Sequence, residues 1–218
     1  MMLLGTILQQ HPTLTVTYRL INVHNGSIQS TQRLSGYTGD KIFSLVDTLA
    51  LIVEHDLSIT PAKPAEMKSV DIVTTRSLGA YRSYLEALEL DRKMYVEEAL
   101  TAMRRAVQLD SSFALAWLWL WRHGNGNQSL DHAQSLAGNL PEREQLQIRM
   151  QSDMRKLDYR AAAEAGEALL RQYPAEQDCY EELSLIYQRL PDYRASERTI
   201  LRGLGRDSLD KILWNSLA

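Results

Sequence analysis

The sequence holds a single cysteine, Cys179, among its 218 residues. One thiol cannot form an internal disulfide or supply a cluster of thiolate ligands for zinc, so both devices are excluded. The cysteine says little about the compartment, because exported proteins also exist without disulfides. The localisation of the chain is therefore left open.

Basic residues are not in excess either, since 24 Lys and Arg stand against 27 Asp and Glu, a net charge of −3. A phosphate backbone is bound by a basic surface, so we expect no direct binding of nucleic acid by this chain. Long apolar runs are also lacking, and none approaches the roughly 20 residues that span a bilayer. The apolar run in the opening MMLLGTILQQ is too short for a signal peptide, and no basic residues precede it. We expect a soluble globular chain with neither an export signal nor a membrane span in these residues.

The motifs of common catalytic and metal sites are missing. The sequence contains no H-E-x-x-H, no G-x-S-x-G and no phosphate loop ending in G-K-[ST]. No two of its five histidines are spaced to share a helical face at i,i+4: they are His11, His24, His55, His123 and His132. Carboxylate pairs such as Glu97-Glu98 are neighbours on a predicted helix, where adjacent side chains diverge by about 100°. We therefore predict no catalytic residue, no metal site and no cofactor, and do not expect an enzyme.

Residues 1–57 are predicted to form a small α+β unit. Apolar side chains occupy every second position of one stretch, the period of a half-buried strand: Leu14, Val16, Tyr18 and Leu20. Residues 5–10 form a plausible third strand before the turn at His11-Pro12. Asp40 can cap a following helix that covers one face of the sheet. The first strand would then leave an open edge, a site for homo-oligomer formation.

Asn25-Gly26 predicts a two-residue type I′ turn between the second and third strands, because both residues readily adopt positive φ. Such a turn pairs Val23 with Ile28 and places Tyr18 on the face opposite Leu34. One extra residue near positions 20–22 would bring the apolar side chains onto one face. We therefore predict a β-bulge there.

The run LLGTILQQHPTLTVTYRLINVHNGSIQSTQRLSGYTGDKIFSLVDTLALIV resembles the C-terminal half of the TolB-like or FlgO-like α/β domain of bacterial regulatory proteins. The shared features are a glycine-led strand, an L-I-x-V-x-x-G hairpin and the following helix. The resemblance implies a partial TolB-like domain at residues 1–57. Residues 58–76 contain Pro61 and Pro64 and lack sustained periodicity, so they are predicted to be a linker.

A four-residue sequence recurs in the second half of the chain, where Asp158-Tyr159-Arg160-Ala161 returns after 34 residues as Asp192-Tyr193-Arg194-Ala195. This interval and the stretch A-L-A-W-L-W-L from Ala114 resemble tetratricopeptide (TPR) repeats, whose antiparallel helix pairs bury their apolar faces against neighbouring pairs. Small residues recur at the close-packing position of each second helix: Ala99, Ala133, Ala162 and Ser196. We predict a mainly α fold, a TPR-like α-α superhelix over residues 77–218. Its helix pairs are expected at 77–113, 114–140, 141–174 and 175–207, with a closing helix at 208–218.

Three departures from the repeat pattern involve glycine. Residues 123–127 read His-Gly-Asn-Gly-Asn, which disfavours helix and predicts a long, mobile hairpin loop. Gly166 and Gly203 lie within predicted second helices, at a cost of about 1 kcal/mol each relative to alanine. A close approach between helices explains such glycines better than a ligand-facing notch at Gly166.

The repeat register places a set of long polar side chains and one tryptophan toward a concave groove. The candidate binding residues are Trp119, Arg122, Gln147, Gln151, Arg155, Gln188 and Arg189, and Glu181 faces the same way. Trp117 and Trp121 share the opposite helical face and are predicted to be core residues. Trp119 is the candidate binding aromatic, with packing against a neighbouring repeat or the hairpin domain as the alternative. The arginines could bind a partner carboxylate bidentately, or be ordinary exposed arginines.

The order of the two modules adds a functional expectation. The run TTRSLGAYRSYLEALEL … VEEALTAMRRAVQLDSSFALAWLWLW … LPEREQLQIR resembles the repeats that follow TolB-like domains in bacterial regulators. Those regulators carry a CadC-like DNA-binding, adenylate cyclase or Ser/Thr kinase domain at the N-terminus. The resemblance implies a non-enzymatic protein-protein interaction module that binds a protein or peptide segment in the concave groove. The alternative is a sensory or regulatory part of a signalling protein whose effector domain lies outside this chain.

Overall fold

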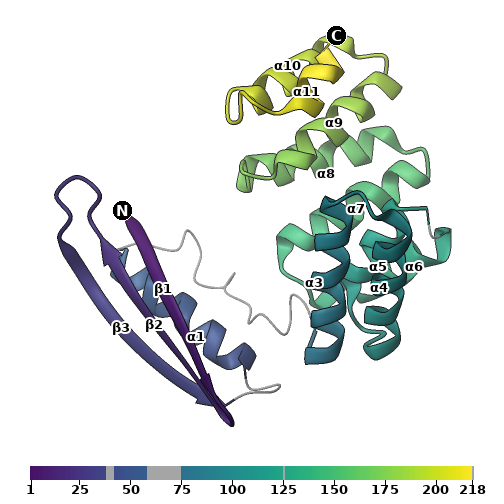
Figure 1. The fold of residues 1–218 in the computed structure, drawn as a ribbon. Helices are drawn as coiled ribbons and strands as arrows, with labels where there is room; N and C mark the ends of the chain where they lie inside the picture. Colours follow the sequence, from purple (N-terminus) through teal and green to yellow (C-terminus); the bar gives the residue numbers. More distant parts are fainter. Residues whose placement is uncertain (38–41, 58–74, 125, 218) are drawn as a thin grey trace. The chain divides into compact units, whose positions relative to one another are not determined.

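The computed structural model describes residues 1–37, 42–57, 75–124 and 126–217. Within these ranges the chain is mainly helical and begins with a small antiparallel sheet, which confirms the predicted fold class at that level (Figure 1). The chain divides into two compact units, Met1–Ser112 and Phe113–Ala218. The predicted cap at Asp40 and nearly all of the predicted linker lie outside the described residues. The proposed domain boundaries therefore stay predictions.

The sheet of unit 1 has the strand order β1-β2-β3. Its strands are β1 (Met2–Gln10), β2 (Thr13–Ile21) and β3 (Ile28–Tyr37), and helix α1 (Ile42–Asp56) contacts β3. The alternation in β2 has the predicted effect, since Leu14, Tyr18 and Leu20 are buried. Together with Leu34 and Leu45, Leu14 and Tyr18 form the core between sheet and helix. Strand β1 begins three residues earlier than predicted.

The hairpin between β2 and β3 differs from the predicted two-residue turn. Asn22 N donates to Ser27 O over 2.9 Å, and Gly26 N donates to Asn22 O over 2.8 Å, so four residues form the connection and Val23 is exposed. The side chains of Asn22 and Asn25 accept from backbone N–H groups two residues later and hold this longer loop. A bulge is present at Leu20/Ile21, as predicted, but the predicted position of its extra residue at 20–22 is wrong. Its extra residue, Gln29, lies on β3 because Leu20 pairs with Ser30 and Ile21 with Ile28.

Asp56 at the end of α1 ties the helix to the sheet. Its carboxylate accepts a 2.7 Å hydrogen bond from the Tyr18 hydroxyl and another from Ser30. Burial, followed by the contact with Asp56, raises the pKa of Tyr18 to about 12. Hydrogen bonds from Ser30 and Tyr18 hold the pKa of Asp56 below its ordinary value. Strands β2 and β3 thus fix the C-terminal turn of α1 by polar contacts as well as apolar ones.

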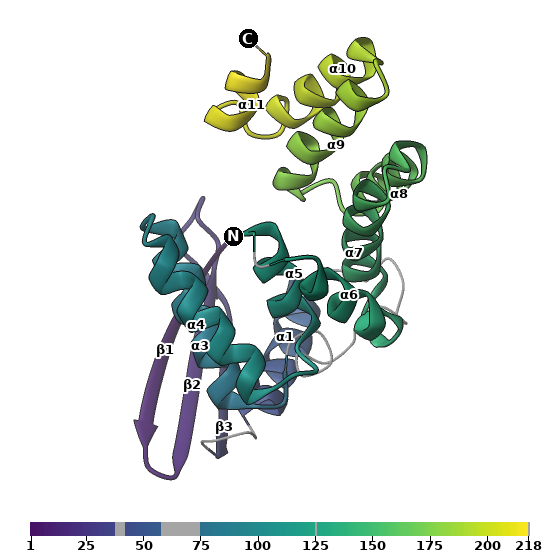
Figure 2. The same cartoon turned by 90° about the vertical axis from the view of Figure 1, so that its right-hand side faces the viewer.

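The helices after residue 76 form hairpin pairs, which Figures 1 and 2 show from two sides. Their bounds are α3 (Leu78–Arg92) with α4 (Val96–Leu109), α5 (Ala114–Arg122) with α6 (Asn127–Leu136), α7 (Glu142–Arg155) with α8 (Tyr159–Gln172), and α9 (Gln177–Arg189) with α10 (Tyr193–Leu204). A short 3-10 helix, η2 (Ala137–Asn139), follows α6, and α11 (Lys211–Leu217) packs against α9 and α10. In unit 2, α6 contacts α7 and α8 contacts α9, so consecutive pairs bury their apolar faces against each other.

The recurring Asp-Tyr-Arg-Ala is the start of a second helix. Asp158 is the N-cap of α8 and accepts a hydrogen bond from Ala161 N over 3.1 Å. Asp192 caps α10 in the same way, accepting from Ala195 N over 3.0 Å. Each aspartate satisfies a backbone N–H that the helix itself leaves without a partner. The repeated sequence therefore encodes the same turn between the helices of two successive pairs.

Small residues let the second helices approach their neighbours. Ala99, Ala133, Ala162 and Ser196 are all buried, as the repeat register predicts. A Cβ added to Gly166 would lie 3.0 Å from both Leu183 Cδ1 and Met150 Sδ. Gly166 is therefore explained by close packing rather than by a notch for a ligand.

Candidate functional site

Side chains from three successive helix pairs meet on the first helices of unit 2. Arg122, the last residue of α5, forms a 2.8 Å ion pair between its Nη2 and Oε1 of Glu182 on α9. Both side chains are largely shielded, at 30% and 21% exposed. The contact spans from one helix pair to the next but one, so it is made only when the pairs are stacked.

Gln151 of α7 lies beside this ion pair. Its side chain is 3% exposed, and its Nε2 makes no hydrogen bond of good geometry with any described residue. The amide is nevertheless close enough to lower the pKa of Glu182. Desolvation is the larger effect and raises the pKa of Glu182, although Arg122 opposes it. The result is a shielded polar cluster with an unused donor and a carboxylate whose charged form is disfavoured.

A second polar contact joins α7 to the start of α9. Glu176, the N-cap residue of α9, accepts a 2.9 Å hydrogen bond from Gln147 Nε2 and pairs with Arg143 Nε at 2.7 Å. The ion pair raises the pKa of Arg143, although desolvation is the largest influence and acts in the opposite sense. Gln147 lies on the same helix as Gln151, but its amide is already engaged within the chain.

Trp119 is buried at 8% exposed, so it is not the exposed groove aromatic that the register predicts. Its ring stacks on His123 with centroids 3.6 Å apart and planes at 14°. His123 Nδ1–H donates to the Trp119 carbonyl over 2.9 Å, which holds the two rings together at the end of α5. Trp117 and Trp121 pack against the apolar core of α5 and α6, as predicted.

The remaining candidates do not join the cluster. Arg155 turns back to α6, where its guanidinium donates to the Asn127 carbonyl over 3.0 Å and pairs with Asp131. Gln188 Nε2 donates to Ser196 Oγ over 3.4 Å, and Arg189 is exposed. The three candidate arginines therefore do not form one surface open to a ligand, because Arg122 and Arg155 each form an ion pair with a carboxylate of this chain.

Sequence reasoning missed the acidic partners Glu176 and Glu182. The register placed Glu181 in the groove, whereas the carboxylate that meets Arg122 is its neighbour, about 100° further around the helix. The available signal was charge complementarity, since α9 begins with several carboxylates opposite arginines on α5 and α7. Helical periodicity alone does not say which of two adjacent glutamates meets an arginine two helix pairs away.

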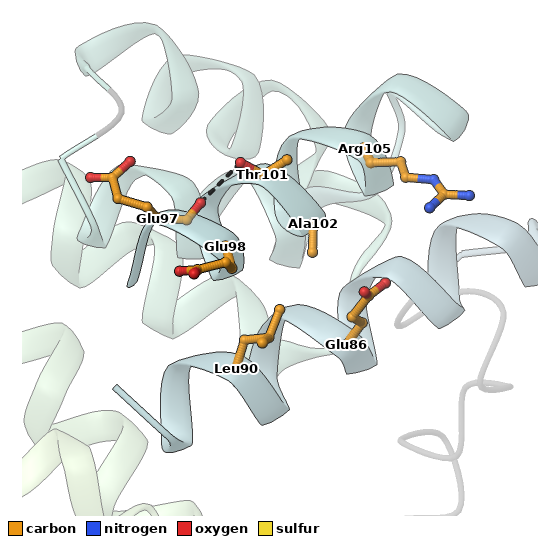
Figure 3. Close-up of a pocket in the computed structure, with 7 residues that line it drawn as sticks. All are labelled: Glu86, Leu90, Glu97, Glu98, Thr101, Ala102 and Arg105. Atoms are coloured by element: carbon orange, nitrogen blue, oxygen red, sulfur yellow. Dashed lines mark hydrogen bonds between the residues drawn. The ribbon is translucent and has the colours of Figure 1, made fainter. Parts of the chain in front are cut away.

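Two other polar features lie outside this cluster: a cavity and a network of hydrogen bonds and an ion pair. A cavity of about 490 Å³ between α3 and α4 is lined by Glu86, Leu90, Glu97, Glu98, Thr101, Ala102 and Arg105 (Figure 3).

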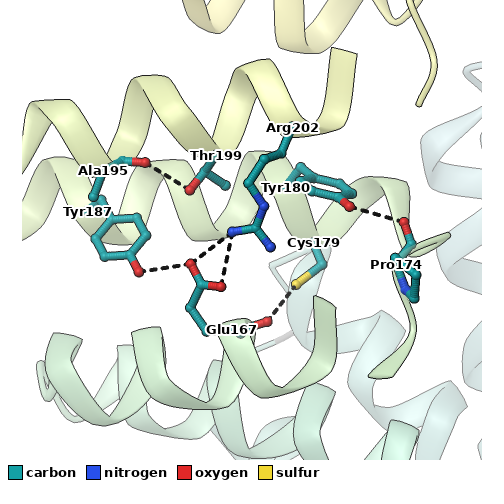
Figure 4. Close-up of polar contacts among 9 residues, drawn as sticks. Glu167, Pro174, Cys179, Tyr180, Tyr187, Ala195, Thr199 and Arg202 are labelled. Atoms are coloured by element: carbon teal, nitrogen blue, oxygen red, sulfur yellow. Dashed lines mark hydrogen bonds and ion pairs between the residues drawn. The ribbon is translucent and has the colours of Figure 1, made fainter. Parts of the chain in front are cut away.

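On the last two pairs, Glu167 of α8 accepts from Tyr187 of α9 at 3.1 Å and pairs with Arg202 of α10 at 3.0 Å (Figure 4). The Glu167 network joins three helices and serves to fix their packing.

Cys179 is buried, and burial raises the pKa of its thiol to about 12, so the nucleophilic thiolate is disfavoured. Within the described ranges, no three His, Cys, Asp or Glu side chains are grouped so as to hold a metal ion. None of the described helices has the length and apolarity needed to cross a membrane.

Comparison with known proteins gives no family assignment. No protein-family model matches this sequence, and no curated protein matches it either.

Proposed function

We propose that this chain is a non-enzymatic module for protein recognition in a bacterial regulatory protein, and that it binds a peptide segment of its partner. The resemblance of the helix pairs to TPR repeats, and of the preceding sheet to part of a TolB-like domain, supports this function. Arrays of stacked helix pairs present extended surfaces made of side chains from several pairs. The first helices of unit 2 are the proposed binding surface.

The polar cluster of Arg122, Gln151 and Glu182 carries the proposal. A buried amide without a hydrogen bond costs free energy, and so does a desolvated carboxylate. In the proposed complex a peptide carboxylate takes the place of Glu182 at the Arg122 guanidinium, and a peptide carbonyl accepts from Gln151. Arginine binds a carboxylate bidentately, so the exchange preserves its pairing.

The test compares binding by two charge-neutral double variants of the full chain. Immobilised protein captures partners from a bacterial lysate, and bound segments are identified by cross-linking and mass spectrometry. The variant Arg122→Gln/Glu182→Gln removes the ion pair between α5 and α9. Arg149→Gln/Asp153→Asn is the matched control, because it removes ion pairs that are local to α7 and its C-cap Lys156, with an Nε–Oδ2 distance of 3.5 Å between Arg149 and Asp153.

We expect capture of the cross-linked segment to fall at least about tenfold for the first variant, equivalent to about 1.4 kcal/mol of binding free energy. The control variant should retain capture. Equal capture by wild type and both variants would show that partners bind elsewhere on the chain.

A further inference from the structure

Strand β1 is an open edge with apolar side chains on both faces. All nine of its residues are exposed, and its large apolar side chains are between 44% and 69% exposed: Met2, Leu3, Leu4, Ile7 and Leu8. Leu3 pairs with Leu20 and Ile7 with Val16, so they project on the same face as the core. Met2, Leu4 and Leu8 project on the opposite face. An apolar run on both faces is typical of a strand whose two faces are both covered, and here both are exposed.

The two edges of the sheet differ in how they are protected. Natural edge strands avoid further pairing through charges, prolines, bulges or a covering element. Strand β3 has Arg33, the bulge at Gln29 and contacts with α1. Strand β1, with the sequence MLLGTILQQ, contains no charged residue and no proline, and pairs with β2 without a register shift. The unprotected edge is therefore β1.

We propose that a second copy of this chain occupies the edge, with the two β1 strands paired antiparallel about a two-fold axis at Gly5. A strand without charge brings no like charges together when it pairs with itself. In this register Leu3 lies opposite Ile7 of the other copy, and Met2 lies opposite Leu8. Cross-strand apolar pairs of this kind stabilise a sheet.

The pairing is isologous, so it closes after two copies and gives one six-stranded sheet. Residues that pair across the axis project on the same face, so both α1 helices lie on one side of the joined sheet. Leu3 and Ile7 of the two copies then form an apolar strip that continues the core of Leu14, Tyr18 and Leu34. Burial of this strip and of the main-chain edge groups is the driving force.

The first test measures the mass of the full chain by sedimentation velocity at several concentrations. We expect a dimer of twice the 24.8 kDa chain mass. Leu3→Lys/Ile7→Lys places lysines opposite each other and should raise the dimer dissociation constant at least about tenfold. Leu3→Glu/Ile7→Lys changes the same two positions but pairs opposite charges, so it should dimerise more tightly than the double lysine variant. Circular dichroism confirms that both variants remain folded.

The second test fixes the register. A Cβ added at Gly5 would meet only Thr17 O within 4 Å, at 3.9 Å, so Gly5→Cys is tolerated, and two such cysteines across the axis would lie within disulfide range. Under mild oxidation we expect a cross-linked dimer. Gln10→Cys is the control, because its two copies would lie roughly 30 Å apart and should not cross-link. A monomeric wild type, a dimer unaffected by the lysines, or a Gly5→Cys dimer that fails to cross-link would each overturn the proposal.

Discussion

Gly203 occupies a position where there is no room for a side chain. A Cβ there would lie 2.5 Å from Leu213 Cδ1 and 2.9 Å from Tyr180 Cγ. Alanine would gain about 1 kcal/mol of helix propensity, yet its Cβ would force the side chains of Leu213 and Tyr180 to shift. The steric cost outweighs the gain because Tyr180 and Leu213 are themselves buried.

We therefore predict that Gly203→Ala lowers the free energy of unfolding by about 1–3 kcal/mol. Urea unfolding followed by circular dichroism measures the change. Gly138→Ala is the matched control, since a Cβ at Gly138 would meet nothing within 4 Å, and it should be neutral or slightly stabilising. A Gly203→Ala protein as stable as wild type would refute the packing explanation.

Glu182 gives a prediction about pH. Its pKa in the folded chain is raised, chiefly by desolvation, so the folded state holds the proton more tightly than the unfolded state. The contribution to stability is therefore fully present below the unfolded pKa of about 4.3 and is lost as pH rises through the folded value. We expect the stability of wild type relative to Glu182→Gln to fall between pH 4 and pH 7. A difference that stays constant with pH would mean that Arg122 cancels the effect of desolvation, and one that grows would mean that Arg122 outweighs it.

At the scale of elements, the turns that precede α4, α8 and α10 share one geometry but not one cap. Asp158, Asp192 and Tyr95 all precede a second helix, with φ of −86°, −98° and −89° and ψ of 73°, 73° and 71°. The two aspartates accept a hydrogen bond from the helix, whereas Tyr95 supplies no side-chain cap to α4. The first pair therefore lacks a side-chain cap on α4, although the backbone at Tyr95 has the conformation that allows one.

We predict that Tyr95→Asp stabilises the chain by about 1 kcal/mol, because the new carboxylate can accept from the N–H of Glu98 in the first turn. Asp158→Ala should instead destabilise it by about 0.5–2 kcal/mol. Thermal unfolding of the two variants measures both effects. Tyr95 is 55% exposed, so its removal costs little apolar burial; a destabilised Tyr95→Asp would show that the ring has another role.

The elements were predictable where local chemistry decides them. Helical periodicity, the small residues at Ala162 and Ser196, and the aspartate caps all depend on near neighbours in the chain. The hairpin at Asn25-Gly26 was not predictable in detail, because the Asn22 side chain competes for the backbone and lengthens the loop. The prediction that Trp119 is exposed was wrong for a related reason. Periodicity gives the helical face on which a residue lies, but the ring of His123 at the end of α5 covers the Trp119 ring on that face.

At the scale of the molecule, the helix pairs of unit 2 stabilise one another. Leu169 and Leu170 of α8 are buried in a core that they share with Leu183 of α9 and with α10. Removing residues 175–218 would expose this face of α8 to water, and a repeat array loses the interface term along with the repeat.

We predict that the chain shortened to residues 1–174 melts at least about 5 °C below the full chain, which corresponds to roughly 1 kcal/mol or more. Circular dichroism of the helices measures the transition in both chains, because tryptophan fluorescence would also report on Trp214, which only the full chain contains. An unchanged transition would show that the pairs fold independently.

The sequence by itself determined the helix pairs, the 34-residue interval of Asp-Tyr-Arg-Ala and the small residues of the second helices. These features follow from contacts between residues that are close along the chain. Only the tertiary structure decided which polar groups meet: Arg122 with Glu182 across two helix pairs, Arg155 with α6 instead of the groove, and Gln151 left with an unused amide. The physical reason is that the rotation and stacking of whole helices determine which long side chains meet. A shift of one residue in the register of α9 would place Glu181 instead of Glu182 beside Arg122.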